Sequence, residues 1–187
     1  MHDISIVRII AGIARGRHLI APKGMDTRPT PDRVRESLFS ILAMQIEGAH
    51  VLDLFAGTGA LGLEALSRGA QKVTLVEHSR KVYPVLKRNI ATVALPGVEL
   101  FIMDALRALT HFASLQFSFN LVFLDPPFAQ NLIEASLIEL VKQNLLLPNA
   151  LIVCEHLGKR LPPYAPDVLK YKETREFGDV ALSFFEA

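Results

Sequence analysis

The sequence predicts an α/β domain in which a parallel β-sheet is connected by crossover helices. Its 187 residues, half of them hydrophobic, are enough for one core and too few for two. From His50 onward, short apolar runs alternate with longer segments of helical period, the pattern of strands joined by helices. The runs are continuously apolar, so both faces of the sheet are expected to be covered.

The elements can be assigned in order along the chain. The expected strands are Val51–Phe55, Val73–Val76, Val98–Ile102, Leu121–Leu124 and Leu151–Cys154. The expected helices span residues 60–68, 80–93, 105–112 and 131–146, with a short element after Leu157. Two further strand-like runs, Val168–Glu176 and Val180–Glu186, flank a short turn and predict a hairpin. The sheet is therefore expected to end in an antiparallel strand.

The chain is expected to divide into an N-terminal extension and a main domain, at residues 1–45 and 46–187. Arg8–Ala11 and His18–Ala21 flank two glycines, and this spacing predicts a small β-hairpin. A helix capped by Thr30 or Asp32 is then expected to run to about residue 42. Its buried face would be formed by Val34, Leu38 and Ile41.

The net charge of +1 conceals an uneven distribution of charge. The first 35 residues contain seven basic and three acidic residues, whereas the remaining 152 contain 13 basic and 16 acidic residues. A basic end on a mildly acidic body is typical of a protein that docks a polyanion at one place. The candidate phosphate-binding residues are Arg8, Arg15, Arg17, Arg28, Arg33 and Arg35. For any one of them, a solvated surface position is the alternative.

Cysteine and histidine usage argues against disulfide and metal chemistry. The one cysteine, Cys154, excludes a disulfide framework and a multi-cysteine zinc site, and its apolar neighbours indicate a core residue. The six histidines show no ligand spacing, so no metal site is expected. Without a secretory signal or an apolar run long enough to span a membrane, the sequence predicts a soluble, cytoplasmic protein.

A glycine-rich segment, Asp53-Leu54-Phe55-Ala56-Gly57-Thr58-Gly59, follows the first strand of the sheet. Its two glycines allow a tight turn that brings backbone close to a ligand, and the next helix offers free N–H groups. Glu77 lies twenty residues after Gly57, so the pattern fits a dinucleotide or a nucleoside cofactor. Asp53 would repel a pyrophosphate and attract a cationic ligand such as S-adenosylmethionine, unless it merely caps a turn.

Asp104 and Ala105 follow the third strand, where an adenine ring would lie in an open parallel sheet. A short acidic side chain at this place can accept a hydrogen bond from the adenine amino group. An N-cap on the following helix is an equally good interpretation of Asp104, and the two roles are compatible.

The fourth strand ends in Asp125-Pro126-Pro127-Phe128. The prolines fix two φ angles and push Asp125 toward an extended conformation, so the backbone is held rigidly. The Asp125 carboxylate and the Pro126 carbonyl can accept hydrogen bonds from the two N–H groups of an exocyclic amine. These two bonds orient the nitrogen lone pair toward an electrophile. The Phe128 ring can stack on a base. The alternative, an ordinary proline-rich strand exit, is disfavoured by the glycine loop one crossover earlier.

These motifs resemble those of amino-group methyltransferases, whose Asn/Asp-Pro-Pro-Tyr/Phe motif is similar to residues 125–128 and whose first cofactor motif is similar to residues 53–59. More narrowly, the chain resembles the RsmD family, bacterial 16S ribosomal RNA guanine methyltransferases that act on the exocyclic amine. The resemblance covers nearly the whole chain in register and is carried further by Arg8–Gly12, Gly16-Arg17, Arg28–Thr30, Asp32–Phe39 and Ala60–Arg68. The departures are a few extra residues before Arg8, and a phenylalanine in the last motif position, where tyrosine also occurs.

The resemblance implies a Rossmann-like, seven-stranded methyltransferase sheet, S-adenosylmethionine as methyl donor, and N2 of a guanine in small-subunit (16S) rRNA as acceptor. It places the cofactor at Asp53, Phe55, Gly57, Gly59, Glu77, Asp104 and Ala105. It places the target base at Asp125, Pro126, Pro127 and Phe128. It also makes rRNA, naked or within an assembling ribonucleoprotein particle, the polyanion expected at the N-terminal arginines. We expect a monomer and no membrane partner.

The expected chemistry is an in-line displacement that needs no metal and no covalent nucleophile, only alignment and a dry pocket. The alternative acceptor is another nucleic acid, either DNA adenine or a different RNA. A DNA methyltransferase should carry a target-recognition domain, for which about 45 residues before the first strand leave little room. An RNA-binding protein with a decayed cofactor site would have lost Asp53, Glu77 or Asp125, and all three are present. The remaining alternative is a nicotinamide-dependent dehydrogenase.

Overall fold

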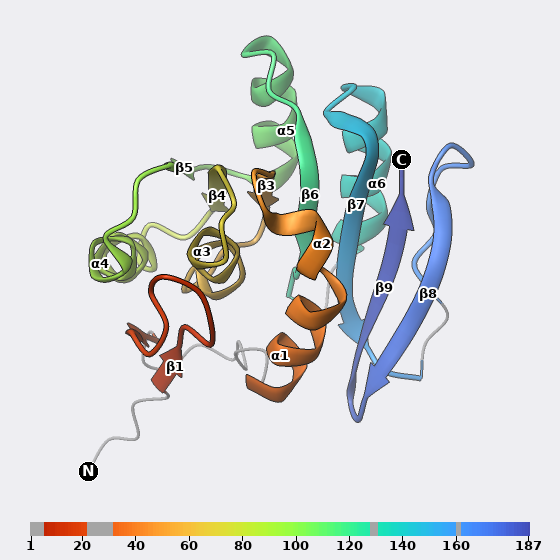
Figure 1. Ribbon diagram of the computed structural model, residues 1–187. Helices are drawn as coiled ribbons and strands as arrows, with labels where there is room; N and C mark the ends of the chain where they lie inside the picture. The colour runs from red at the N-terminus through yellow and green to blue at the C-terminus, as the bar shows by residue number, and fades with distance from the viewer. Residues whose placement is uncertain (1–5, 22–31, 128–130, 160–161) are drawn as a thin grey trace.

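Seven apolar segments form the central sheet of the protein, shown in Figure 1 as a computed structural model that describes residues 6–21, 32–127, 131–159 and 162–187. The strands are β3 (His50–Asp53), β4 (Lys72–Glu77), β5 (Val98–Ile102), β6 (Phe119–Leu124), β7 (Leu146–Leu157), β8 (Lys170–Phe177) and β9 (Val180–Glu186). Their order across the sheet is β5-β4-β3-β6-β7-β9-β8. Strands β3 to β7 are parallel, and β9 is antiparallel to both of its neighbours. The predicted parallel sheet with an antiparallel C-terminal strand is confirmed.

Helices cover both faces of this sheet, as the continuously apolar strands require. One face carries α1 (Asp32–Ile41), α2 (Ala43–Ile46), α3 (Ala60–Ser67) and α4 (Tyr83–Val93), and the other carries α5 (Ala105–Ser114) and α6 (Leu132–Lys142). From β3 the chain builds outward through β4 to β5, and it then crosses to β6 on the other side of β3. The strand order therefore reverses between β3 and β6, which is where open α/β sheets bind their ligands.

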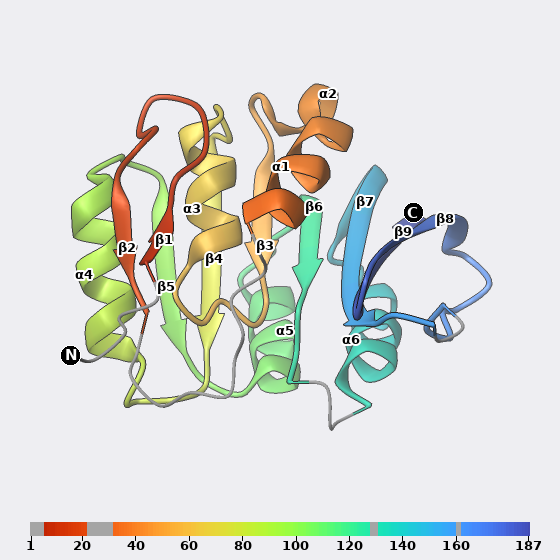
Figure 2. The same cartoon turned by 90° about the horizontal axis from the view of Figure 1, so that it is seen from below.

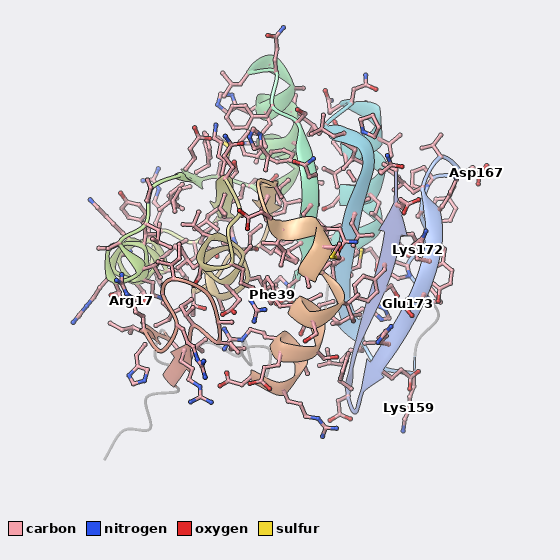
Figure 3. The ribbon with its side chains drawn as sticks, viewed as in Figure 1. Arg17, Phe39, Lys159, Asp167, Lys172 and Glu173 are labelled. Carbon is pink, nitrogen blue, oxygen red and sulfur yellow. The ribbon has the colours of Figure 1, made fainter. Side chains whose placement is uncertain are left out.

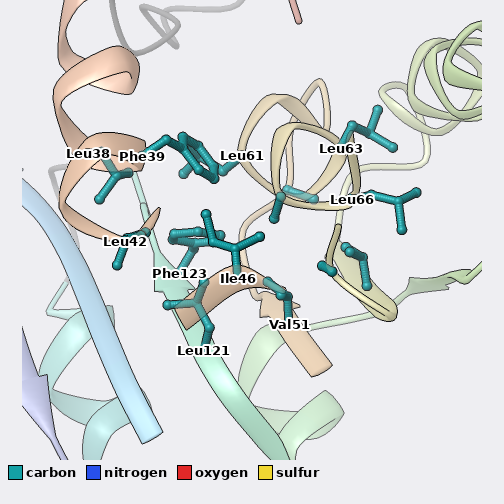
Figure 4. Close-up of a cluster of buried hydrophobic side chains, with 14 of the residues drawn as sticks. Leu38, Phe39, Leu42, Ile46, Val51, Leu61, Leu63, Leu66, Leu121 and Phe123 are labelled. Atoms are coloured by element: carbon teal, nitrogen blue, oxygen red, sulfur yellow. The ribbon is translucent and has the colours of Figure 1, made fainter. Parts of the chain in front are cut away.

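Successive strand residues contribute to two separate hydrophobic clusters. Val51 and Phe123 point to the face of α1 and α3, whereas Leu52 and Leu124 point to the face of α5 and α6. Figure 4 shows the first cluster, in which the ring centroids of Phe39 and Phe123 lie 5.9 Å apart. The burial of Val34 and Leu38 confirms the predicted face of α1.

An N-terminal hairpin packs on the outer side of α3, and its strands are β1 (Ile6–Arg8) and β2 (His18–Ile20). The backbone N–H groups of Ile10 and Ala11 donate to the Glu64 carboxylate at 2.7 and 3.0 Å. Gly12 has a φ of +81°, and a Cβ there would stand 1.8 Å from the carbonyl oxygen of Ser67. Only glycine therefore allows the hairpin to lie this close to α3.

The tip of the hairpin lies far from the carboxyl ends of the strands. Helix α3 starts just after β3, at the carboxyl edge of the sheet, and runs back toward the opposite edge. The hairpin contacts Glu64 and then Ser67 as it approaches its tip, so it follows α3 in the same direction. Figure 2 shows the hairpin loop at the edge of the molecule opposite the arrowheads of the parallel strands.

Several element boundaries differ from those predicted. Helix α6 ends at Lys142 rather than near residue 146, because Asn144 adopts a φ of +52°. Helix α4 starts at Tyr83, where the following proline suits a first helical turn. Helix α2 was not predicted. After Leu157 the described residues form no helix, because β7 continues to that point and pairs with β9.

Three observations bear on chemistry outside the carboxyl edge. Cys154 is fully buried in β7, and burial raises the pKa of its thiol well above the usual range, which confirms the predicted core role. Across the described ranges, no three His, Cys, Asp or Glu side chains gather in a way that could hold a metal ion. None of the helices in those ranges is both long and apolar enough to cross a membrane.

Candidate active site

Four acidic side chains converge at the carboxyl edge of the sheet, where the strand order reverses. Asp53 ends β3, Glu77 ends β4, Asp125 directly follows β6, and Glu155 lies near the end of β7. Electrostatic repulsion acts between Asp53 and Glu77, and between Asp125 and both Asp53 and Glu155. The strand register thus brings together residues from four separate parts of the chain.

The glycine loop connects β3 to α3 beside these carboxyls. The Ala56 N–H donates to the Val76 carbonyl oxygen at 2.8 Å, which ties the loop to the neighbouring strand. Gly57 and Gly59 have φ angles of +52° and +81°. A Cβ on Gly59 would stand 2.7 Å from Cδ1 of Leu86, so a side chain there would collide with α4. The predicted glycine turn is confirmed, and it presents backbone to the carboxyl edge.

Asp53 is almost fully buried, and its Oδ2 accepts a hydrogen bond of 3.0 Å from the Gly62 N–H in the first turn of α3. Burial raises the pKa of its carboxyl from 3.8 to about 7, with repulsion from Glu77 as a further cause. The hydrogen bond from Gly62 acts in the opposite direction. Asp53 is therefore poised to gain or lose a proton near neutral pH, and a cation placed beside it would favour the charged form.

Glu77 holds the glycine loop with both of its carboxylate oxygens. Oε2 accepts from the Gly57 N–H at 3.0 Å, and Oε1 accepts from the Ser79 N–H at 2.7 Å. Each carboxylate oxygen has a second lone pair, so these bonds leave acceptor capacity for a ligand hydroxyl. The sequence pointed to Glu77 as a ligand contact, and its part in shaping the loop was not anticipated.

Asp104 and Ala105 lie at the carboxyl edge after β5, in line with the other candidate cofactor residues. The Asp104 side chain caps α5, because its Oδ1 accepts from the Arg107 N–H at 3.1 Å. The cap interpretation is thus confirmed, and the exposed carboxylate retains capacity for a second partner. Phe55 is half-buried beside the glycine loop and packs against the α5 and α6 cluster.

Asp125, Pro126 and Pro127 leave β6 toward the same edge. Asp125 is half-buried, Pro126 is buried and Pro127 is exposed. Burial raises the pKa of Asp125 well above its ordinary value, and repulsion from Glu155 and Asp53 adds to this effect. Phe128, the last residue of the motif, lies outside the described residues.

Glu155 directly follows the fifth predicted strand, where an acidic residue could line the pocket, although the sequence alone favours a solvated or capping carboxylate. The structure leaves only 5% of it exposed. The pairing of Leu124 with Cys154 places Asp125 and Glu155 level with each other on neighbouring strands. An acidic residue after four apolar strand residues was the available signal, and its meaning depended on which strand lay beside it.

Charge at this edge fits a cationic ligand. Among the residues described, no lysine or arginine forms an ion pair with Asp53, Glu77 or Asp125, and the basic side chain beside Glu77 is that of His78, whose Nδ1 lies 3.3 Å from Oε1. Buried carboxylates without counterions are costly, and a ligand that carries positive charge relieves that cost. The open face of Gly57, where a Cβ would meet nothing closer than 4.0 Å, leaves room for such a ligand.

The arginines expected to bind phosphate do not form a single cluster. Arg8, Arg15, Arg17 and Arg33 are exposed, and Arg28 lies outside the described residues. Arg17 donates from Nη1 to the backbone carbonyls of Thr92, at 2.8 Å, and Val93, at the C-terminus of α4.

Arg35 differs from the other arginines because its side chain is fully buried. Its Nη2 donates to the Arg8 carbonyl oxygen at 2.9 Å and pairs with Oδ1 of Asp32 at 2.6 Å. The guanidinium joins α1 to the hairpin and is not available to a partner at the surface. The structure thus contradicts the expectation that Arg35 contacts phosphate.

The model of a family described as "Conserved hypothetical protein 95" matches residues 7–186. Two proteins named Ribosomal RNA small subunit methyltransferase D are similar to the chain. That of Haemophilus influenzae is 43% identical, and the match covers 90% of this chain and 89% of the relative. That of Escherichia coli K12 is 39% identical, and the match covers 96% of this chain and 89% of the relative. The solved structure of yhhF from Escherichia coli superposes with a TM-score of 0.86 at 37% identity and covers 97% of both chains. The chain therefore belongs to the RsmD family, the family of ribosomal RNA small subunit methyltransferase D.

Proposed function

We propose that the protein transfers a methyl group from S-adenosylmethionine to N2 of a guanine in small-subunit (16S) ribosomal RNA. One observation carries this proposal. The Asp125-Pro126-Pro127 segment stands at the same edge as the glycine loop and the buried acidic cluster. Family membership supports the choice of acceptor, because relatives 39 to 43% identical are named for small-subunit rRNA.

The residues at the carboxyl edge fit S-adenosylmethionine, which supplies a methyl group already activated on a sulfonium when it is bound. The buried carboxylates attract its positive charge, and Gly57 and Gly59 let the backbone approach it closely. We assign the methionine part to Asp53, Phe55 and the two glycines, and the ribose to Glu77. Asp104 and Ala105 are assigned to the adenine.

At the acceptor side, Asp125 and the Pro126 carbonyl orient the target amine. The amine of guanine is a poor nucleophile because its lone pair is delocalised into the ring. Two acceptors that take hydrogen bonds from its two N–H groups turn the lone pair toward the methyl group. They also stabilise the positive charge that develops on the nitrogen. The sequence assigns the stacking role to Phe128.

The guanine must leave its stack to reach Asp125, so the substrate is an unstacked nucleotide displayed by folded RNA. The exposed arginines Arg8, Arg15, Arg17 and Arg33 are candidates to bind its phosphates. We further propose that the protein acts as a cytoplasmic monomer on rRNA within an assembling particle.

The proposal is tested by methyl transfer to rRNA from cells that lack the enzyme. Small-subunit rRNA is incubated with labelled S-adenosylmethionine, and the modified nucleotide is mapped. We expect label on a guanine N2 with the wild-type protein and a loss of at least about a hundredfold in rate with Asp125→Ala, because an oriented acceptor is removed. Asp125→Asn keeps an amide oxygen as acceptor and should retain more activity than Asp125→Ala.

Label on DNA or protein, or undiminished transfer by Asp125→Ala, would contradict the proposal. Equilibrium binding separates it from the dehydrogenase alternative. We expect S-adenosylmethionine to bind and NAD not to bind, because the buried carboxylates repel a pyrophosphate.

A further inference from the structure

The hairpin tip and the catalytic edge lie at opposite ends of α3, which poses a problem for RNA binding. Arg15 and Arg17 belong to the hairpin loop, near the end of α3 marked by Ser67. Asp125 and Asp53 lie at the carboxyl edge. An RNA that reaches both places must cross the surface between them.

Helix α4 spans this distance. It begins shortly after Glu77, at the carboxyl edge, and its 11 residues extend about 16 Å toward the opposite edge. Its last turn receives the hydrogen bonds of Arg17. One turn earlier, the Asn89 side chain bonds to both the N–H and the carbonyl of Ile20, at 2.8 and 2.9 Å. Strand β2 therefore lies along α4, as Figure 2 shows, and Figure 3 shows Arg17 near α4.

Charge on these two segments is of one sign. Residues 6–21 and 78–98 contain seven lysine and arginine residues and no aspartate or glutamate. The other 150 residues contain 13 basic and 19 acidic residues, so the rest of the chain is clearly acidic. Basic residues are thus concentrated in the hairpin together with the α4 segment, and not in the N-terminal residues alone.

The cations of α4 and of the turn before it are exposed. They are Arg80, Lys81, Lys87 and Arg88. Lys87 and Arg88 lie on α4, whereas Arg80 and Lys81 belong to the turn that leads into it. Within the part of the chain that the structure describes, none of these four residues forms an ion pair. Nothing described thus neutralises their charge.

We propose that α4 and the hairpin form one RNA-binding surface, the basic strip, which consists of Arg80, Lys81, Lys87, Arg88, Arg15 and Arg17. The strip guides the rRNA backbone from the target guanine at Asp125, along α4, to the hairpin tip. This inference rests on the proposed function and names the surface by which that substrate is held. In this arrangement Arg17 also fastens the hairpin to α4, so the two halves of the strip stay aligned.

The strip explains what the hairpin contributes to a reaction that takes place at the other edge. A phosphate contact far from the target base carries no sequence information, but it fixes the register and orientation of the RNA. Each cation that neutralises a phosphate also releases counterions, so binding through the strip must weaken as salt concentration rises.

Charge reversal on α4 tests the inference. We expect Lys87→Glu and Arg88→Glu each to weaken binding of small-subunit rRNA at least about tenfold and to lower the slope of log affinity against log salt by about one or more. The matched control is Lys170→Glu on β8, at the other end of the sheet, which changes the net charge equally at an exposed lysine. The control should bind rRNA almost as wild type does.

Binding of S-adenosylhomocysteine completes the test. It should be unchanged in the α4 variants, because Lys87 and Arg88 are not among the residues assigned to the cofactor. If the wild type methylates rRNA but the α4 variants bind it as the Lys170→Glu control does, the inference is wrong and the proposed function stands. If the wild type does not methylate rRNA at all, the proposed function itself fails.

Discussion

At the scale of single residues, the main feature is a carboxyl that is buried beside other carboxyls. Asp53 has a pKa of about 7 in the folded protein against 3.8 for the free side chain. Between these two values the folded protein keeps a proton that the unfolded chain releases. The contribution of this proton to the free energy of unfolding is therefore fully present below pH 3.8 and is lost as pH rises through about 7. The whole contribution amounts to about 4 kcal/mol.

Replacement of Asp53 by Asn should remove this dependence. The amide oxygen can still accept from Gly62, but the side chain no longer titrates. We expect the free energy of unfolding of wild type to fall relative to that of Asp53→Asn as pH rises from about 4 to 7, measured by urea denaturation. Parallel pH profiles for the two proteins would show that Asp53 does not titrate as described.

The same substitution should weaken binding of the cofactor. In wild type, affinity for S-adenosylmethionine should increase as pH rises through about 7, because the carboxylate that attracts the cation is then formed. In Asp53→Asn the affinity should be lower and less dependent on pH. Isothermal titration calorimetry at several pH values measures both effects.

At the scale of elements, α3 shows how closely the hairpin and the sheet are coupled. The helix is buried from Leu61 to Ser67, with the sheet on one side and the hairpin on the other. A helix without a polar face must be covered all round, and the hairpin provides the outer cover. The contact depends on Gly12, which lies against the backbone of Ser67.

Two glycines of the hairpin permit a matched comparison. Gly12 and Gly16 have φ angles of +81° and +82°, but a Cβ on Gly16 would meet nothing within 4 Å. Gly16→Ala should therefore cost only the left-handed strain, about 1 kcal/mol. Gly12→Ala adds a collision with the Ser67 carbonyl and should destabilise the protein more and weaken rRNA binding. Equal midpoints of thermal unfolding for the two variants would contradict this account of the packing.

At the scale of the whole molecule, the N-terminal extension and the main domain share one core. Val7, Ile9 and Leu19 of the hairpin are buried in the same cluster as Phe39 and Phe123. We propose that residues 1–45 contact RNA while forming a structural part of the methyltransferase fold. The extension would then couple RNA binding to the stability of the catalytic edge, because Asn89 bonds both Ile20 and the Thr58 carbonyl.

Deletion of residues 1–21 tests this coupling. Four buried apolar side chains are lost, and the three larger ones, Val7, Ile9 and Leu19, are each worth about 1.5–3 kcal/mol. The buried Glu64 also loses its partners from the hairpin backbone. We expect a markedly lower thermal midpoint and weaker binding of S-adenosylhomocysteine, measured on the truncated chain beside the full chain. A truncated chain as stable as the full chain would show that the hairpin is a separate appendage.

The sequence by itself determined the strands of the central sheet, the glycine turn and the acidic candidates Asp53, Glu77 and Asp125. These features depend on local patterns, such as apolar period, turn residues and proline stiffness, and each is contained within a few consecutive residues. Only the tertiary structure decided that Glu155 lies beside Asp125, that Arg35 is buried, and that the hairpin lies along α4. Strand order and the packing of the hairpin on α3 and α4 set these outcomes, because they bring together residues that no local spacing relates.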